Sequence, residues 1–214
     1  MEAASALDVL ALGAQVGGDG ITAHLREDRR HIRDSDIARI QAATSLPLNP
    51  ETAATEEMLE IALKHMPHAA CIVPERREER TTEGGLDVVG SRDKVAIAVR
   101  RLKDAGIVVS LFLDPDPAQL DVAAGLGVDA VELHTGVYAH ATLKHHAQES
   151  NAALETLLAA GKQIRAAGLT LNAGHGLTYR NVQPVASIEG LHELNIGHSI
   201  IARAIMVITA AGHG

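Results

Sequence analysis

Ionisable side chains follow a short apolar run near the start of this sequence. The segment HLREDRRHI, residues 24–32, comes directly after GITA and contains two histidines among many charged residues. Histidine and carboxylate groups can transfer protons near neutral pH, and arginine can bind an anion such as phosphate. Hydrophobic patterning does not require so much charge at this point. We therefore interpret His24 and Arg26 as candidates for a functional site.

The same pattern recurs along the chain. Any single acid or histidine after a strand is more often a helix cap or a loop residue, but a whole series that converges on one rim is harder to dismiss. The carboxyl ends of parallel strands form such a rim, which is where barrel enzymes place their active sites. The series comprises His24, Arg26, Asn49, Glu51, Glu75, Asp114, Glu132, His134, Asn172, His175, Asn195 and His198.

Three glycine-containing segments indicate anion binding. NAGHG (172–176) and NIGH (195–198) follow the last two expected strands, where glycine lets backbone N–H groups approach a phosphate. The alternative is that these glycines only form tight turns. TTEGG (81–85) lies in a long connection, 74–90, which is typical of a lid or binding loop. The alternative there is a plain solvated loop, and the run PERREER (74–80) is interpreted as solvated.

Helical segments that end in glycine alternate with short β-branched runs, as in KDAGIVVSLFLD. Glycine just past a helix is the expected left-handed stop. Runs that are apolar nearly throughout favour strands covered on both faces, and therefore a parallel sheet. The expected strands are 20–25, 46–51, 69–73, 107–113, 129–134, 169–173 and 193–197.

Seven strand-to-helix units leave two main architectures. A doubly wound sheet would carry a glycine-rich phosphate turn after its first strand, whereas GGDG here precedes a strand. A TIM (β/α)8 barrel fits better, although it needs eight strands. We find no internal boundary, so residues 1–214 are expected to form a single α/β barrel domain.

Composition excludes several functional classes. With 46% hydrophobic and 21% charged residues the chain is globular, and its net charge of −8 argues against nucleic acid as a partner. The one cysteine, Cys71, is expected in the core, and no motif has metal-ligand spacing. No stretch is long enough to span a membrane, and no signal peptide is recognisable, so a cytoplasmic location is expected.

The motifs occur in an order that resembles one known family. HLREDRRHI, TEEML, the PE…TTEGGLDV loop, ELHTG-Y, NAGHGLTY and HELNIGH-II closely resemble the pyridoxine 5′-phosphate synthases of the deoxyxylulose-dependent vitamin B6 pathway. The resemblance covers nearly the whole chain. It implies a barrel that assembles as an octamer and requires no cofactor. It also implies that 3-amino-2-oxopropyl phosphate condenses with 1-deoxy-D-xylulose 5-phosphate, giving pyridoxine 5′-phosphate, phosphate and water.

The resemblance also assigns roles to matching positions. His24 and Glu51 match proton acceptors, His175 matches a proton donor, and Glu132 matches a residue that aids the transition state. The positions that match phosphate-substrate contacts fall into two sets. Those for the deoxyxylulose phosphate are Arg26, His31 and Thr81, and those for the aminoketone phosphate are Gly176, Gly197 and His198.

The sequence departs from the family pattern at two places. The family's first strand carries an Asn, an Asp-His pair and a following Arg that bind substrate, but this chain begins in what resembles the next helix, ALDVLALGAQVGG. Its last helix, ending in TAAGHG, is short. We therefore expect a barrel without its first strand and part of its last helix. In addition, the family's Asn-Leu-Glu-Met reads Asn-Pro-Glu-Thr at 49–52, where Pro50 removes a backbone donor.

These departures keep alternatives open. A catalytic synthase is one hypothesis, and a non-catalytic barrel remnant that binds a phosphate-bearing ligand or serves as an oligomer subunit is another. A different phosphate-binding enzyme, such as an aldolase, is less favoured because no lysine stands at a strand end to form a Schiff base. We further expect unpaired edges at the strands over 20–25 and 193–197. The chain as written is then expected to fold loosely and to have little activity.

Overall fold

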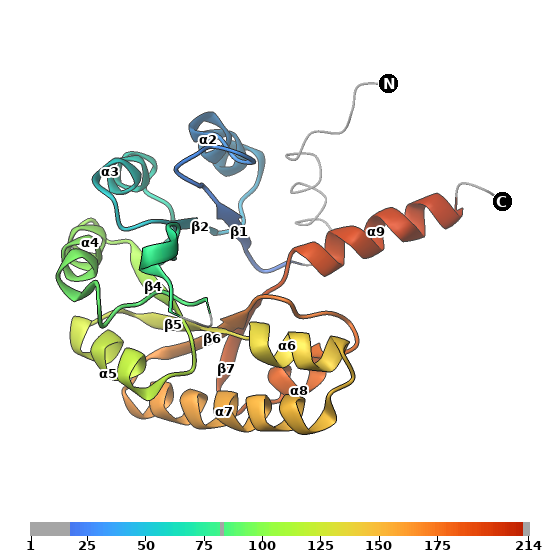
Figure 1. Ribbon diagram of the computed structural model, residues 1–214. Coiled ribbons are helices and arrows are strands. Elements are labelled where there is room, and N and C mark those ends of the chain that lie inside the picture. The colour runs from blue at the N-terminus through green and yellow to red at the C-terminus, as the bar shows by residue number, and fades with distance from the viewer. Residues whose placement is uncertain (1–17, 82–83, 212–214) are drawn as a thin grey trace.

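A curled parallel sheet organises the protein. The computed structural model describes residues 18–81 and 84–211, and within these ranges seven parallel strands pair in sequence order from β1 to β7. Helices alternate with the strands, as expected for a TIM-like α/β fold (Figure 1). The strands are β1 (Ile21–His24), β2 (Leu48–Thr52), β3 (Ala69–Ile72), β4 (Val108–Leu113), β5 (Ala130–His134), β6 (Thr170–Gly174) and β7 (Leu191–Asn195).

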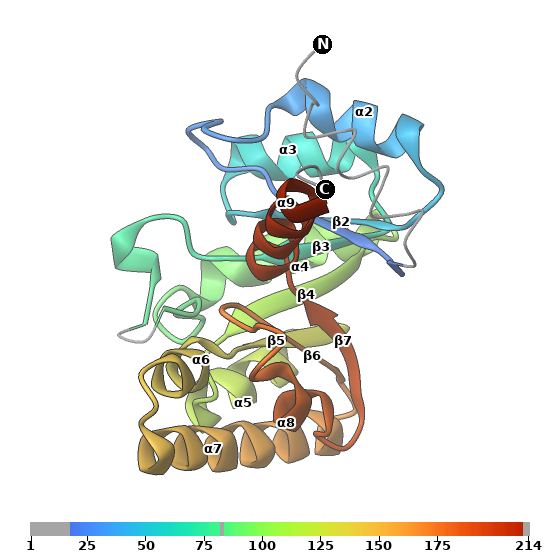
Figure 2. The same ribbon diagram turned by 90° about the vertical axis from the view of Figure 1, so that its right-hand side faces the viewer.

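The larger helices lie outside the curve of the sheet, and α9 projects away from it (Figures 1 and 2). A short 3-10 helix, Arg77–Glu79, interrupts the connection after β3. The helix expected over 6–18 lies, except for its last residue, outside the described residues. The α-helices are α2 (Asp34–Ala43), α3 (Glu56–His65), α4 (Arg92–Asp104), α5 (Pro117–Leu126), α6 (Gly136–Leu143), α7 (Ala147–Ala166), α8 (Val182–Ala186) and α9 (His198–Ala211).

Local sequence explains how these elements begin and end. The carboxylate of Asp116 accepts a hydrogen bond from the Ala118 N–H, and Pro117 occupies the first turn of α5. Gly127 ends α5 in the left-handed region with a φ of 70°. This stop needs glycine because a Cβ would be strained there. The chain then passes directly into β5, so the turn residues fix where each strand starts.

All seven expected strands are present, and each observed boundary lies within two residues of its expected position. β7 differs most, because it begins at Leu191 rather than at 193. β1 and β7 are the two ends of the described sheet, as expected. They nevertheless meet through side chains, since the Thr22 hydroxyl donates a 2.7 Å hydrogen bond to Asn195 Oδ1. The sheet therefore curls far enough to bring its two ends together.

Apolar side chains pack between the sheet and its helices, whereas polar side chains face the inside of the curve. The main core joins β3–β6 to the helices outside them, and a smaller cluster lies beneath α2. On the inner face, strand register places Glu51 opposite Cys71 and Glu132 opposite Asn172. Paired residues share a face, so the register alone directs several ionisable groups inward.

Pro50 affects the backbone pairing of β2 with β3. The pairing of β2 with β3 includes only Glu51↔Cys71 and Thr52↔Ile72, whereas β1 pairs with β2 over four residues. Proline cannot donate a backbone hydrogen bond, which accounts for the late start of the β2–β3 ladder. Glu51, the next residue, is still paired on both sides. The substitution therefore shortens the ladder without displacing the residue after it.

In the described part of the chain, no helix is long and apolar enough to cross a membrane.

Candidate active site

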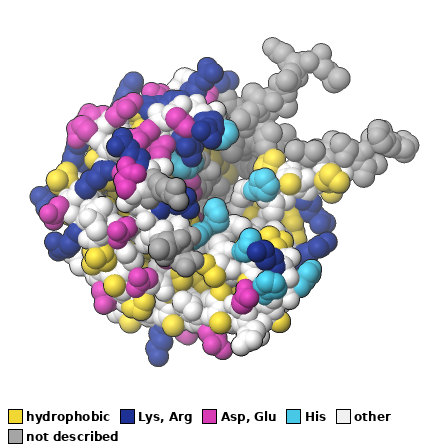
Figure 3. Space-filling view, viewed as in Figure 1, with side chains coloured by type: hydrophobic (Ala, Val, Ile, Leu, Met, Phe, Trp, Pro, Cys, Tyr) yellow, Lys and Arg dark blue, Asp and Glu magenta, His cyan; other side chains and the backbone are white. Residues whose placement is uncertain are grey.

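A cavity of about 690 Å³ opens at the carboxyl end of the strands. Every strand contributes to its lining directly or through the segment that follows it. Eight of the twelve rim candidates line it: His24, Arg26, Glu51, Glu75, Glu132, His175, Asn195 and His198. The face of the molecule in Figure 3 shows histidines around its centre and right, whereas charged side chains crowd over α2 and α3. The predicted convergence on one rim is therefore observed.

His24 and Glu51 form a pair on one wall of the cavity. His24 Nδ1 lies 3.6 Å from Glu51 Oε2, and both side chains are partly buried. Burial, followed by the positive charge of Arg26, lowers the pKa of His24, whereas burial raises the pKa of Glu51. The two shifts bring the imidazole and carboxyl pKa values closer together. Such a pair can accept and return protons at one position in the cavity.

Glu132 is the most deeply buried acid of the cavity, with 2% of its surface exposed. Burial and the nearby negative charge of Glu51 raise its pKa to about 8, so the carboxyl group is mostly protonated at neutral pH. Its Oε2 accepts a 2.8 Å hydrogen bond from Asn195 Nδ2 and a longer one from the Cys71 thiol. Because Oε2 accepts both of these hydrogen bonds, they favour Oε1 as the protonated oxygen.

The side-chain amide of Asn195, on β7, is oriented by Thr22 of β1 at the other end of the sheet. Thr22 donates to Asn195 Oδ1, so the amide nitrogen must face Glu132. Gly174 makes room for this arrangement, because an added Cβ there would collide with Glu132 Oε1 and lie 2.9 Å from the Asn195 carbonyl oxygen. The cavity floor is thus fixed by residues of β1, β5, β6 and β7.

His175 closes another side of the cavity in a strained backbone conformation, with a φ of 83°. Its ring lies edge-on to His134 with centroids 4.8 Å apart, and Phe112 contacts both rings. Burial, with the charges of His134 and Arg80, lowers the pKa of His175. A non-glycine residue held in the left-handed region is a recognised feature of functional sites.

Two glycine-containing segments border the cavity beside His175. Gly176 has a φ of 76°, and an added Cβ would lie 2.9 Å from the Ala139 Cβ. Gly197 precedes α9, and an added Cβ would meet nothing within 4 Å. Because α9 starts at His198, its first backbone N–H groups have no partner within the helix. The NIGH segment can therefore offer N–H groups to an anion. Anion binding by NAGHG and NIGH stays a prediction.

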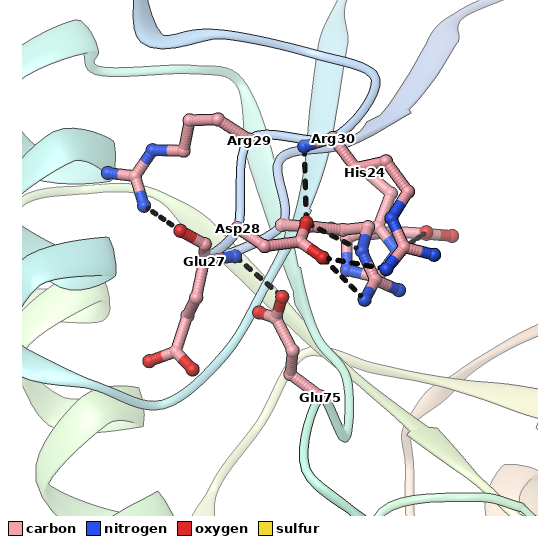
Figure 4. Close-up of polar contacts among 8 residues, drawn as sticks. His24, Glu27, Asp28, Arg29, Arg30 and Glu75 are labelled. Atoms are coloured by element: carbon pink, nitrogen blue, oxygen red, sulfur yellow. Dashed lines mark hydrogen bonds and ion pairs between the residues drawn. The ribbon is translucent and has the colours of Figure 1, made fainter.

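Charged residues surround the mouth of the cavity. The Arg26 guanidinium binds the Asp28 carboxylate through two hydrogen bonds of 3.0 and 3.2 Å, which lower the pKa of Asp28 to about 2. Glu75 Oε1 accepts a 2.5 Å hydrogen bond from the Glu27 N–H, which ties the segment after β3 to the segment after β1 (Figure 4). These contacts hold the HLREDRRHI segment over the cavity.

Two predicted site residues occupy different positions. His31 is exposed and is not among the described residues that line the cavity. Thr81 also lies outside that lining, and its hydroxyl donates to the buried carboxylate of Asp114. The remaining predicted residues, His24, Arg26, Glu51, Glu132, His175, Gly176, Gly197 and His198, all line the cavity.

Sequence reasoning missed several cavity residues. Arg80 and Phe112 line the cavity. Arg80 belongs to the run that was interpreted as solvated, and it is exposed, but that interpretation did not place it at the cavity. Phe112 stands two residues before Asp114 on β4, and strand alternation could have placed it on the inner face. No signal in the sequence pairs Thr22 with Asn195, because 173 positions separate them.

In the described residues, no group of three or more His, Cys, Asp or Glu side chains is arranged to hold a metal ion.

A curled parallel sheet with acid–base groups and glycine loops at its carboxyl end defines a TIM-like barrel enzyme. Residues 3–211 match the family described as "Pyridoxal phosphate biosynthesis protein PdxJ", and this chain belongs to that family.

Curated relatives agree with this assignment. The pyridoxine 5′-phosphate synthase of Rhodospirillum rubrum is 56% identical over 196 residues, which cover 92% of this chain and 78% of that protein. The enzyme of the same name from Magnetococcus marinus is 52% identical over 201 residues, covering 94% and 82%. Similarity at this level extends over nearly all of the chain.

Solved structures support the fold alone. A putative phosphonomutase from Burkholderia cenocepacia superposes with a TM-score of 0.64 at 14% identity, covering 97% of this chain and 90% of the other. The YdjI aldolase from Escherichia coli gives 0.63 at 17% identity, with coverage of 94% and 73%. The described sheet thus has the general architecture of these proteins.

Proposed function

We propose that this protein is a pyridoxine 5′-phosphate synthase. In this reaction 3-amino-2-oxopropyl phosphate condenses with 1-deoxy-D-xylulose 5-phosphate to give pyridoxine 5′-phosphate, phosphate and water. The observation that carries the proposal is the convergence of His24, Glu51, Glu132 and His175 on one cavity, in a chain that is more than half identical to synthases of this name.

The chemistry requires several proton transfers around one pocket. An amine must attack a carbonyl group, water and phosphate must leave, and the ring must close. We assign His24 and Glu51 as proton acceptors, and their 3.6 Å separation supports joint action. His175 is assigned as proton donor, because its lowered pKa makes its protonated form a stronger acid.

Glu132 is assigned to transition-state stabilisation. A carboxyl group with a pKa of about 8 donates a hydrogen bond as a neutral acid at neutral pH. Such a donor can stabilise negative charge that develops on a substrate oxygen, and the surrounding protein holds it ready for that step. The hydrogen bond from Asn195 Nδ2 to Oε2 keeps the protonated oxygen in one position.

Two phosphate-bearing substrates need two anion sites. Gly176, Gly197 and His198 are assigned to the aminoketone phosphate, supported by their position beside the start of α9. Arg26 is assigned to the deoxyxylulose phosphate, and this assignment is supported by its position in the cavity lining. For His31 and Thr81 the same assignment is supported by the family resemblance alone.

We propose that the protein acts in the cytoplasm as a homo-oligomer. The location is supported by the biosynthetic role of the family. Self-association is supported by α9, which exposes Ile200, Ile201 and Val207 on a helix that projects from the sheet. Light scattering coupled to gel filtration tests the second point, since a monomer at micromolar concentration would contradict it.

A stoichiometric assay tests the function. The purified protein is incubated with both substrates, and pyridoxine 5′-phosphate and inorganic phosphate are measured over time. The proposal predicts equal amounts of the two products, and no pyridoxine phosphate when either substrate is omitted. Folded protein that binds both substrates without forming product would instead favour a non-catalytic barrel that binds phosphate-bearing ligands.

A further inference from the structure

Asp114 is a buried carboxylate that none of the roles above uses. It directly follows β4, is 3% exposed, and accepts hydrogen bonds from the Thr81 hydroxyl and from the Gly85 N–H at 3.0 Å. The His134 Nδ1 lies 2.7 Å from its other oxygen, Oδ1. Burial alone would raise the pKa of Asp114, but these three hydrogen bonds outweigh burial and lower it. Asp114 is therefore ionised and can only accept.

The charge of Asp114 determines the state of His134. Because the carboxylate can only accept a hydrogen bond, His134 Nδ1 must carry the proton that it donates. The same bond fixes the ring plane, since only one orientation points Nδ1 at Oδ1. This is the arrangement by which an acid selects one tautomer of a neighbouring imidazole.

The surrounding backbone is shaped around the His134 ring. Gly84 and Gly136 lie against it, and a Cβ at Gly136 would collide with Nε2. A Cβ at Gly84 would lie 3.2 Å from Cε1, and its φ of 125° suits glycine alone. His134 is 8% exposed and packs against Phe112. The ring is thus held on its faces by packing and at its edge by Asp114.

The ring of His134 in turn supports His175. The two imidazoles meet edge to face at 4.8 Å. The neighbouring residue, Thr135, is fully buried and donates its hydroxyl to the carbonyl oxygens of Gly174 at 2.7 Å and His175 at 2.6 Å. The end of β5 therefore holds both the side chain and the backbone of a residue whose φ of 83° is strained.

We propose that Asp114 and His134 are positioning residues that orient His175 for proton transfer. Asp114 fixes the tautomer and plane of His134, and His134 fixes the imidazole of His175 at the cavity wall. Thr81 and Gly85 attach the connection after β3 to the same carboxylate, so that connection and His175 share one support. The assignment rests on the proposed function of His175 but makes predictions that need no turnover.

The first test replaces Asp114 with Asn, which keeps its size but removes its charge. The amide nitrogen would then face His134 Nδ1, and this nitrogen must become an acceptor. We expect ¹⁵N NMR of the full chain to show His134 protonated at Nδ1 in the unaltered protein and at Nε2 in Asp114→Asn.

In the synthase assay of Asp114→Asn, kcat should fall by about 10–100-fold with little change in KM, the usual effect of a misplaced catalytic group. Asp104→Asn, an exposed position at the end of α4, is the matched control.

The second test addresses His175 directly. His134→Phe keeps a ring against His175 but removes the imidazole, which is one of the groups that lower the pKa of His175, so this pKa should rise toward its ordinary value. NMR titration without substrates measures this shift, with His175→Gln identifying the resonance. His134→Asn retains a donor close to the position of Nδ1 and serves if His134→Phe does not fold, with the same expected rise.

The outcomes separate the positioning role from the proposed function. If the unaltered protein makes no pyridoxine phosphate, the proposed function fails, while the tautomer and the titration still test the positioning. An unchanged His134 tautomer in Asp114→Asn, or an unchanged His175 titration in both His134 variants, would overturn the positioning role.

Discussion

Glu51 and Glu132 are both buried acids in one cavity, and they differ in the order in which they release protons. Burial alone raises the pKa of Glu51, whereas burial and the charge of Glu51 together raise that of Glu132 to about 8. Titratable groups whose environments separate their pKa values are typical of acid–base sites. At this scale Glu51 is suited to accept a proton and Glu132 to donate a hydrogen bond.

The raised pKa of Glu132 predicts a pH-dependent stability. A group whose folded pKa exceeds its unfolded value stabilises the fold fully below the unfolded pKa, near 4.5 for Glu132, and loses this contribution as pH rises through about 8. We expect the free energy of unfolding in urea to decline between these values. Glu132→Gln should remove part of that decline, whereas Glu155→Gln, at an exposed position, should leave it unchanged. Identical pH profiles for Glu132→Gln and the unaltered protein would contradict the assigned pKa.

Residue types and their positions after strands were sufficient to predict most of this site. His24, Glu51 and Glu132 lie within strands, His175 directly follows β6, and all four line the cavity. The direction of the His31 side chain could not be predicted from the sequence, because a loop residue has no fixed periodicity that would orient it. Asn195 was placed on the rim, but its bond to Thr22 depends on the curl of the whole sheet.

At the scale of elements, the loops after β6 and β7 supply the candidate anion site. An added Cβ at Gly197 would meet nothing within 4 Å, so Gly197→Val should leave the fold intact. Its side chain should block close approach of a phosphate to the backbone N–H groups, so binding of 3-amino-2-oxopropyl phosphate should weaken at least about tenfold, or 1.4 kcal/mol. Isothermal titration calorimetry measures this change. Gly125→Val is the control, because an added Cβ at Gly125 also meets nothing within 4 Å and Gly125 lies in α5, outside the cavity lining. Unchanged affinity in folded Gly197→Val would show that NIGH is only a turn.

The hydrogen bond between Thr22 on β1 and Asn195 on β7 gives a second prediction at the scale of elements. Thr22→Val keeps the side-chain shape and removes the hydroxyl that orients Asn195. Loss of this hydrogen bond should lower the free energy of unfolding by about 0.5–1.5 kcal/mol. Because the bond from Asn195 lowers the pKa of Glu132, freeing the amide should also raise that pKa. Urea unfolding at several pH values measures both effects.

Thr156→Val, on an exposed face of α7, should produce neither effect. A Thr22→Val protein as stable as the unaltered one would mean that the contact does not hold the two ends of the sheet together.

At the scale of the whole molecule, the repeating pattern of the sequence was enough to predict the fold. Short apolar runs, several of them preceded by glycine, predicted seven strands, and all seven occur in the described sheet in sequence order. The sequence could not predict the hydrogen bonds on the inner face of the sheet. Their partners, Thr22, Cys71, Glu132 and Asn195, meet only after the sheet curls. The expected loose folding and weak activity of the chain remain predictions, which the unfolding and turnover measurements test.

The rate of pyridoxine 5′-phosphate formation by the unaltered protein and by Glu51→Gln tests the central claim most directly. Glutamine keeps the size of Glu51 but cannot accept a proton, so turnover should fall about 10²–10⁴-fold. Binding of both substrates, measured by calorimetry, should change far less. Glu57→Gln, at an exposed position on α3, should retain the full rate. Product formation by the unaltered protein with this selective loss is the predicted result, and a Glu51→Gln protein that turns over at full rate would contradict the account.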